Sequence, residues 1–175
     1  GTGVVSAAAI SSAVVSAAAI SSAITVEDAL SQWQALFPGQ DYVVWEKDAP
    51  WDHLDRVTGP PAGVTEVQNI SLDIGRNEYE SSSFVITSLV DVGGATAVFD
   101  LSYVPNAIST TLRKGIWITS LDGTEVNDAL SLIDGNQVTI APGESLEIWV
   151  TLDGNDAAAG LYNQTVNILP QGFAS

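Results

Sequence analysis

The chain has 175 residues, no cysteine, and a formal net charge of −16, with five Lys and Arg against 21 Asp and Glu. So acidic a chain is a poor partner for nucleic acid, because phosphate binding needs basic side chains. Without cysteine there are no disulfides and no thiolate metal ligands. With 46% hydrophobic residues the chain can still bury a core, and its length suits one domain plus an extension.

Residues 4–23 are one decapeptide, VVSAAAISSA, written twice without change. Ten is a whole number of strand periods but not of helical turns, so only an extended strand keeps both copies on the same face. The repeat therefore favours a strand, and a pilin-like N-terminal helix is the alternative. An uncharged strand of this kind would run about 66 Å and would invite pairing with other chains.

The apolar residues of this extension are the candidate contacts with a neighbouring subunit. They are Val4, Val5, Ile10, Val14, Val15, Ile20 and Ile24. The high Ser content makes the segment a poor membrane span, and no initiator Met or basic stretch precedes it. We expect residues 1–24 to be a mature terminus left after processing that is donated as a strand, although a signal-peptide remnant or flexible linker would also fit.

Residues 25–64 are expected to form a short helix and a connector. Thr25 and Asp28 have the spacing of a capping box, and apolar residues then recur at helical intervals as far as Pro38-Gly39. This pattern predicts a helix over about 26–36. A short strand is expected at 41–45, followed by a polar and aromatic stretch and a Pro/Gly loop.

From residue 65 onward, apolar stretches alternate with turn signals such as Asp122-Gly123 and Pro142-Gly143. The expected strands are 66–74, 82–90, 95–103, 114–120, 137–140, 145–152 and 161–169. Alternation directs Leu146, Ile148, Val150 and Leu152 toward a core and Trp149 to the opposite face. The predicted fold is mainly β: an immunoglobulin-like antiparallel β-sandwich of about seven strands over 65–175, with an extended apolar N-terminal strand and one short helix.

Three stretches resemble a known module. They are LDIGRNEYE at 72–80, DALSL at 128–132, and IAPGESLEIWVT at 140–151 with AAAGLY at 157–162. Together they resemble the immunoglobulin-like β-sandwich at the N-terminus of large secreted glycoside-hydrolase-like proteins, over about residues 65–170. The resemblance implies a sandwich and an exported setting but carries over no catalytic residue, because in that family a catalytic barrel follows the sandwich. The architecture also resembles donor-strand filament subunits of archaea and bacteria.

Few residues are suited to catalysis, and we expect neither enzyme activity nor a resident cofactor. His53 is the only histidine, so a zinc site would need carboxylates as its other ligands, and we expect a surface or packed residue. Four carboxylates crowd around two tryptophans nearby: Glu46, Asp48, Asp52 and Asp55 around Trp45 and Trp51. This group could grip a sugar or form a solvated acidic loop.

Oxygen-bearing side chains in the expected turns could bind calcium incidentally, although none matches a twelve-residue calcium loop. They are Asp122, Glu125, Asp128, Asp134, Asp153, Asn155 and Asp156. Two sequons, at Asn69 and Asn163, would suit an exported glycoprotein.

These features predict a structural subunit of an extracellular filament, tube or sheath, a homopolymer that exchanges residues 4–23 between copies as a donor strand. The alternative is a carbohydrate-binding or accessory β-sandwich module of a secreted enzyme system, with exposed aromatic residues contacting polysaccharide. The candidates for that contact are Trp45, Trp51, Trp117 and Trp149. Both functions place the protein outside the cell or at its surface, with no nucleic-acid partner and no membrane span.

Overall fold

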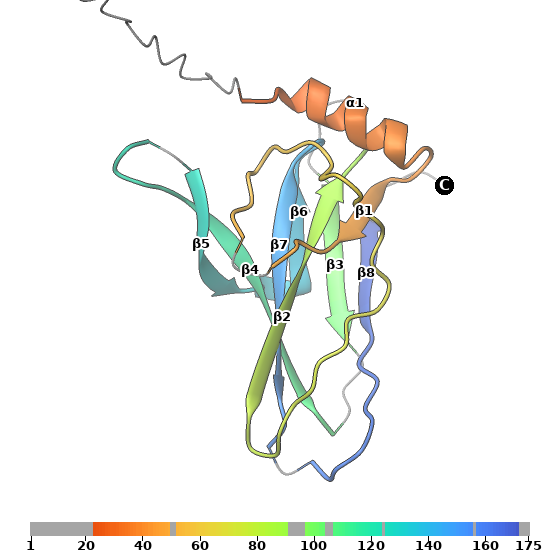
Figure 1. Cartoon of the computed structure of the whole chain (residues 1–175), viewed down its shortest axis with the longest axis vertical. Helices are drawn as coiled ribbons and strands as arrows, with labels where there is room; N and C mark the ends of the chain where they lie inside the picture. The colour runs from red at the N-terminus through yellow and green to blue at the C-terminus, as the bar shows by residue number, and fades with distance from the viewer. Residues whose placement is uncertain are drawn as a thin grey trace, which may run out of the picture.

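The computed structural model describes residues 23–49, 52–90, 97–103, 107–123, 125–155 and 157–171. Within these ranges the chain forms one α-helix, one 3₁₀-helix and eight strands in two sheets (Figure 1). The expected mainly β sandwich with one short helix is confirmed. The predicted N-terminal strand, apart from Ala23, lies outside the described residues.

The two sheets are unequal, and every neighbouring pair of strands is antiparallel. The larger has the order β1 (Tyr42–Trp45), β2 (Tyr79–Ser88), β7 (Ser145–Asp153), β4 (Ser109–Thr119) and β5 (Glu125–Leu132). The smaller has the order β6 (Gln137–Ile140), β3 (Ala97–Tyr103) and β8 (Val166–Gln171), with the 3₁₀-helix η1 (Asp134–Asn136) just before β6. Because β1 belongs to the larger sheet, the 25–64 region is built into the sandwich instead of preceding it.

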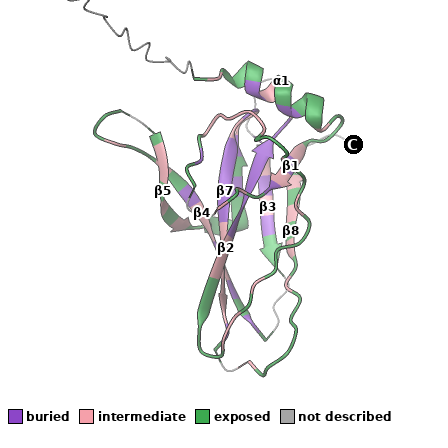
Figure 2. Ribbon diagram, in the orientation of Figure 1, coloured by how far each residue is buried: buried purple, intermediate pink, exposed green. Residues whose placement is uncertain are grey.

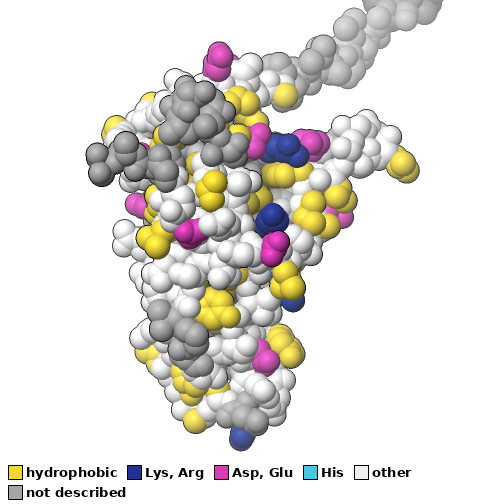
Figure 3. Space-filling model, turned by 180° about the vertical axis from the view of Figure 1, so that it is seen from behind, with side chains coloured by type: hydrophobic (Ala, Val, Ile, Leu, Met, Phe, Trp, Pro, Cys, Tyr) yellow, Lys and Arg dark blue, Asp and Glu magenta, His cyan; other side chains and the backbone are white. Residues whose placement is uncertain are grey.

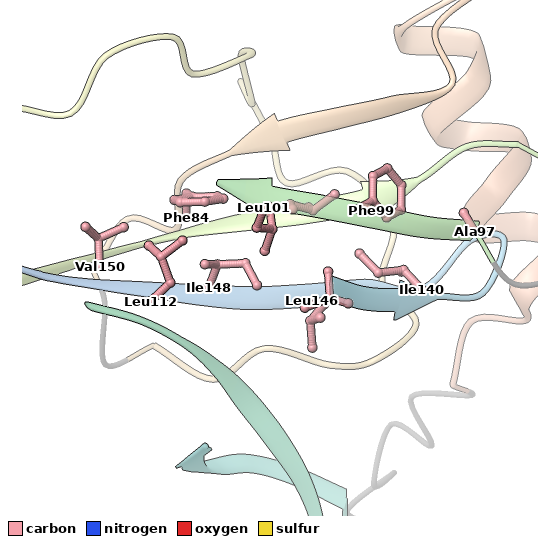
Figure 4. Packing of buried hydrophobic residues seen from close by; sticks show 11 residues of the cluster. Phe84, Ala97, Phe99, Leu101, Leu112, Ile140, Leu146, Ile148 and Val150 are labelled. Carbon is pink, nitrogen blue, oxygen red and sulfur yellow. The ribbon is translucent and has the colours of Figure 1, made fainter. Parts of the chain in front are cut away.

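The inner faces of the two sheets enclose a first hydrophobic core. Leu146, Ile148 and Val150 of β7 are buried in it, as their alternation predicted, and Leu152 packs against it (Figure 4). The other buried members come from β2, β3, β4 and β6: Phe84, Ile86, Ala97, Phe99, Leu101, Leu112, Val138 and Ile140. Two sheets with apolar inner faces thus account for most of the buried apolar surface.

A second core lies on the outer face of the larger sheet, under the helix α1 (Val26–Leu36) (Figure 1). The helix begins where Thr25 Oγ1 accepts a hydrogen bond from the Asp28 N–H at 3.1 Å, as the capping spacing predicted. Trp33 is fully buried and donates its indole N–H to the Thr58 carbonyl oxygen at 2.7 Å. It is clustered with Val43 and Trp45 of β1, Val85 of β2, Leu89 just after β2, and Leu54 of the connector.

Three parts of the strand prediction are corrected. The strand expected at 161–169 is β8, which begins only at Val166 and ends at Gln171. Residues 66–74, expected as a strand, belong to neither sheet: the Val67 N–H bonds to the Val44 carbonyl oxygen at 2.8 Å, and Ile74 packs over Gly154. The alternating apolar side chains of this segment pack against the sheet, but its backbone does not pair with a strand. Conversely, no strand was expected over 125–132, where Glu125 and Asp128 were placed in turns, but these residues form β5. The register shift between Ile116 and Trp117 on β4 shows that a β-bulge in β5 absorbs Asp128.

Candidate assembly surface

The hairpin formed by β4 and β5 projects from the side of the sandwich (Figure 1). β4 pairs with β7 only as far as Lys114 opposite Ile148, whereas its pairing with β5 extends from Arg113 to Thr119. Beyond Lys114 the hairpin is therefore a two-stranded ribbon without β7 beside it. Such a ribbon buries little apolar surface on its own.

Large apolar side chains are exposed along this hairpin. They are Ile116 (38% exposed), Ile118 (40%), Leu121 (110%), Leu130 (45%) and Leu132 (66%). Directly opposed residues of an antiparallel pair share a face, so Ile116 lies with Ala129 on one face. Leu130 and Leu132 lie on the other, opposite Gly115 and Arg113. Both faces of the ribbon thus present apolar groups to solvent. Figure 2 shows β5 and the hairpin turn as mostly intermediate or exposed, and Figure 3 shows hydrophobic side chains at the tip of the hairpin and nearer the body.

The outer edge of β5 is the most open sheet edge in the described part of the chain. β5 has eight residues, whereas the other edge strands β1, β6 and β8 have four, four and six. β8 contains Pro170, which has no N–H to donate, and β1 is approached by Val67. The unpaired N–H and C=O groups of an edge such as β5 are a template for a further strand.

Arg56 holds the turn end of the hairpin against the connector. Its guanidinium carbon lies 5.4 Å from the centroid of the Trp117 ring, and its Nη2 lies 3.0 Å from Glu125 Oε1. The carbonyl oxygen of Arg56 accepts a hydrogen bond from the Ser145 N–H at 2.8 Å, and Val57 forms an isolated bridge with Glu144. One residue of the connector thus joins β4, β5 and β7 where the strands separate.

Positive charge gathers on the same side. Three of the five basic residues of the chain lie along the hairpin: Arg113 and Lys114 at its base, and Arg56 beside Glu125 near its turn. A groove of about 350 Å³ opens there, and its lining includes Arg56, Lys114, Ile116, Trp117, Ile140 and Leu146. The carboxylates of Glu125 and Glu144 stand beside these basic groups, so this surface carries both signs of charge.

A second and more polar cleft, of about 520 Å³, lies beside the connector. Its lining includes the carboxylates that the sequence grouped together, Glu46, Asp48, Asp52 and Asp55, and also His53. The His53 Nε2 and the Asp55 Oδ1 are 2.9 Å apart on the exposed surface. Lys47 is buried against Glu147 at 2.8 Å and also donates to the Asp52 carbonyl oxygen at 2.7 Å. Among the described residues, no three His, Asp or Glu side chains gather into a metal site.

The tryptophans proposed for sugar contact differ in how far they are buried. Trp45 is only 3% exposed and donates its indole N–H to Thr87 Oγ1 at 2.8 Å, because the alternation of β1 turns it toward α1. It is therefore excluded as a surface platform. Trp117 lies against Arg56, while Trp149, half-buried and paired with Ser83 and Arg113, still has some ring accessible. Trp51 lies outside the described residues.

The predicted interface residues of the repeat cannot be placed in the same way. Val4, Val5, Ile10, Val14, Val15 and Ile20 lie outside the described residues. Ile24 is half-buried and packs against Gly59 of its own chain. Asn69 and Asn163 are exposed in loops, where a glycan can be accommodated, and their glycosylation stays a prediction.

Comparison with known proteins gives no further guide. No protein-family model matches the chain, and no curated protein matches it. Over the described ranges between residues 23 and 171, no helix is long and apolar enough to cross a membrane. Any statement about function must therefore come from the residues and their arrangement.

Proposed function

We propose that the chain is a structural subunit of an extracellular filament, tube or sheath, which polymerises when one copy donates its N-terminal repeat to a sheet edge of the next. The observation that carries this proposal is the projecting β4–β5 hairpin, whose outer edge is open and whose faces expose Ile116, Ile118, Leu130 and Leu132. A monomer with such an edge is prone to strand addition. A subunit that recruits a strand from its neighbour turns that tendency into assembly.

The repeat has the chemistry that a donated strand needs. It contains only Val, Ser, Ala and Ile, so every backbone N–H is available and neither face carries a charge. Backbone hydrogen bonds would supply adhesion, and small Ala and Ser side chains would allow close approach to the acceptor. A contact between one copy's repeat and another copy's body is heterologous, so repeating it gives an open fibre.

The charge of the chain fits the same function. At a net charge of −16, bodies repel each other at low ionic strength, which opposes disordered aggregation. A neutral tether can join them without bringing their acidic surfaces together. Polymerisation should therefore be promoted by salt, which screens the repulsion over about 10 Å at 0.1 M.

The test compares the full chain with a variant lacking residues 1–22, by negative-stain electron microscopy and sedimentation velocity. The deletion stops before Ile24 and Thr25, because these pack against Gly59 and cap α1. We expect polymers from the full chain and monomers from the deletion. Polymers of equal length from both would overturn the proposal.

A matched pair of substitutions separates strand formation from mere presence of the tail. Replacing Ala8 and Ala18 together by Pro removes two backbone donors and restricts the strand, whereas replacing the same two residues by Ser keeps both. The Ala→Pro pair should abolish polymers and the Ala→Ser pair should retain them. Equal polymerisation of the two variants would contradict a donated strand.

A carbohydrate-binding or accessory module remains the second candidate, and the open acidic cleft beside the connector is the observation that favours it. Its carboxylates could accept hydrogen bonds from sugar hydroxyls, as in many sugar sites. Affinity electrophoresis in soluble polysaccharides tests it, with Asp52→Asn as the cleft variant and Asp134→Asn as a control outside the cleft. Retardation that only Asp52→Asn removes, from a chain that forms no polymers, would favour this function.

A further inference from the structure

We propose that the acceptor for the N-terminal repeat is the outer edge of β5, and that one decapeptide of a second copy occupies it as an added antiparallel or parallel strand. This inference rests on the proposed function and specifies its acceptor. It takes the occupant to be residues 4–13 or 14–23 of a neighbouring chain.

The first argument is length. A decapeptide in extended conformation spans about 33 Å, and the eight residues of β5 span about 27 Å. The strands that form the centre of the larger sheet, β2, β7 and β4, have 10, 9 and 11 residues. One decapeptide therefore has the length of one strand of this sandwich, and the 20-residue repeat has the length of two.

The second argument is the chemistry of the edge. After the bulge at Asp128, the edge runs through Ala129, Leu130, Ser131 and Leu132, which carry no charge. An adjacent strand lies about 4.8 Å away and would cover part of Leu130 and Leu132 on one face and of Ala129 on the other. Both faces of the decapeptide are made of Val, Ile, Ala and Ser, so either can meet these residues without burying a charge.

The third argument comes from the other edges. The edges of β1 and β6 are only four residues long, too short for a decapeptide, and β8 carries Pro170. Because a proline cannot donate to a ladder, β8 offers an interrupted edge. Among the described residues, β5 is the longest edge strand and the one that carries exposed apolar side chains without a proline, and beyond the bulge at Asp128 its pairing is regular from Ala129 to Leu132.

The experiment uses cysteine cross-linking, for which the cysteine-free chain gives a clean background. One full-length variant carries Ser131→Cys on β5, and partner variants carry Ser6→Cys, Ser16→Cys, Ser11→Cys or Ser21→Cys. Opposed residues in adjacent strands have the Cα separation of about 4.4–6.8 Å that a disulfide requires. One partner is labelled with ¹⁵N, so mass spectrometry of the linked peptides tells bonds between chains from bonds within one.

The expected result depends on which face of the donated strand carries the cysteine. Ser6 and Ser16 share one strand face and Ser11 and Ser21 share the other, since residues ten apart are on the same side. One of the two pairs should cross-link to the Ser131→Cys variant several-fold more than the other, and both of its members should do so. The matched control, Asn167→Cys on the exposed face of β8, should capture the repeat several-fold less.

The outcomes separate this inference from the proposed function. Polymers with disulfides at Asn167→Cys and none at Ser131→Cys would overturn β5 as acceptor and leave donor-strand assembly intact. Mixed-isotope disulfides at Ser131→Cys without polymers would support the acceptor and count against a filament. Bonds within single chains only, persisting on dilution, would show the repeat folding onto its own β5 and would overturn a second copy as donor. If neither polymers nor disulfides form, both proposals fail.

Discussion

The two ends of the larger sheet differ in how many layers cover them. At the β1–β2 end, α1 and the connector cover the outer face and the smaller sheet covers the inner one, so Val43, Val85 and Ile86 are 0% exposed. At the other end, the β4–β5 hairpin projects beyond Lys114, and the leucines and isoleucines of this projecting part and of β5 are 38% exposed or more. The two ends have similar apolar side chains, so burial here is decided by which elements pack over a strand.

This contrast shows how one sheet can both stabilise a domain and present a contact surface. The buried residues of both hydrophobic cores lie outside the projecting part of the hairpin, and their many contacts fix the fold. The hairpin adds little to stability and is free to be functional, because regions of low local stability can change partners at little cost.

Three leucines provide the direct comparison. Leu101 (0% exposed) lies in the first core, Leu89 (1%) in the second, and Leu132 (66%) on the hairpin. Leu101→Ala and Leu89→Ala should each lower the free energy of unfolding by about 2–5 kcal/mol, since each leaves a cavity. Leu132→Ala should change it by no more than about 0.5 kcal/mol. Urea unfolding followed by circular dichroism measures all three, and a large loss for Leu132→Ala would show that the hairpin is part of the stable core.

The ion pairs Lys47–Glu147 and Arg56–Glu125 differ in burial in the same way. Lys47 and Glu147 are 6% and 4% exposed at the covered end, whereas Arg56 and Glu125 are 36% and 48% exposed near the turn of the hairpin. Glu147→Gln should cost about 3 kcal/mol, at the low end for breaking a buried pair, because Lys47 keeps its bond to the Asp52 carbonyl oxygen. Glu125→Gln should cost no more than about 1 kcal/mol.

A double variant sharpens this prediction. Replacing Lys47 by Met and Glu147 by Leu removes both charges, so no buried charge is left without a partner. Most of the stability lost in Glu147→Gln should return, since apolar replacements of buried pairs are often neutral or stabilising. A double variant less stable than Glu147→Gln would mean that the pair contributes net stability beyond avoiding an unpaired charge.

The features that the sequence predicted well were encoded locally. The helix was expected at 26–36 and spans Val26–Leu36, because its cap at Thr25, its apolar period and its stop at Pro38-Gly39 are all contained in one short stretch. The strands at 137–140 and 145–152 were also placed to within one residue, since they flank the Pro142-Gly143 turn and Gly143 takes a φ of +76° there. In each case neighbouring residues were enough.

The features that it missed depend on pairing. Residues 66–74 alternate like a strand but find no ladder, and β5 does not alternate strictly yet pairs through a bulge at Asp128. For the same reason the open edge of the candidate assembly surface could not be foreseen, because the sequence does not say which strand lies beside which. Trp45 was misjudged because whether a strand face is solvent-exposed depends on α1 packing over it.

Arg56→Ala should loosen the hairpin without unfolding the domain. It removes the contact with Trp117 and the ion pair with Glu125, each worth up to about 1 kcal/mol when partly exposed. Hydrogen exchange should quicken in residues 115–119 and in β5, while amides of β2 and β7 keep their protection and serve as the internal control. Equal acceleration throughout would show that Arg56 supports the global fold and not the hairpin alone.

The smallest effect concerns Tyr42, which joins the two sheets at the covered end. Its hydroxyl donates to the Ile168 carbonyl oxygen at 3.2 Å, and burial raises the pKa of Tyr42, with smaller contributions from Glu66 and Asp41. The folded state therefore holds this proton to higher pH than the unfolded state, in which the pKa is about 10. Unfolding above that pH releases a proton that the folded protein keeps, so the stability due to this group is complete below pH 10 and is lost as pH rises toward the folded pKa. Tyr42→Phe should cost about 1 kcal/mol at neutral pH and should flatten the decline in stability above about pH 10. Tyr103→Phe, at an exposed tyrosine of β3, is the control, and an unchanged slope in Tyr42→Phe would assign the alkaline loss of stability to other groups.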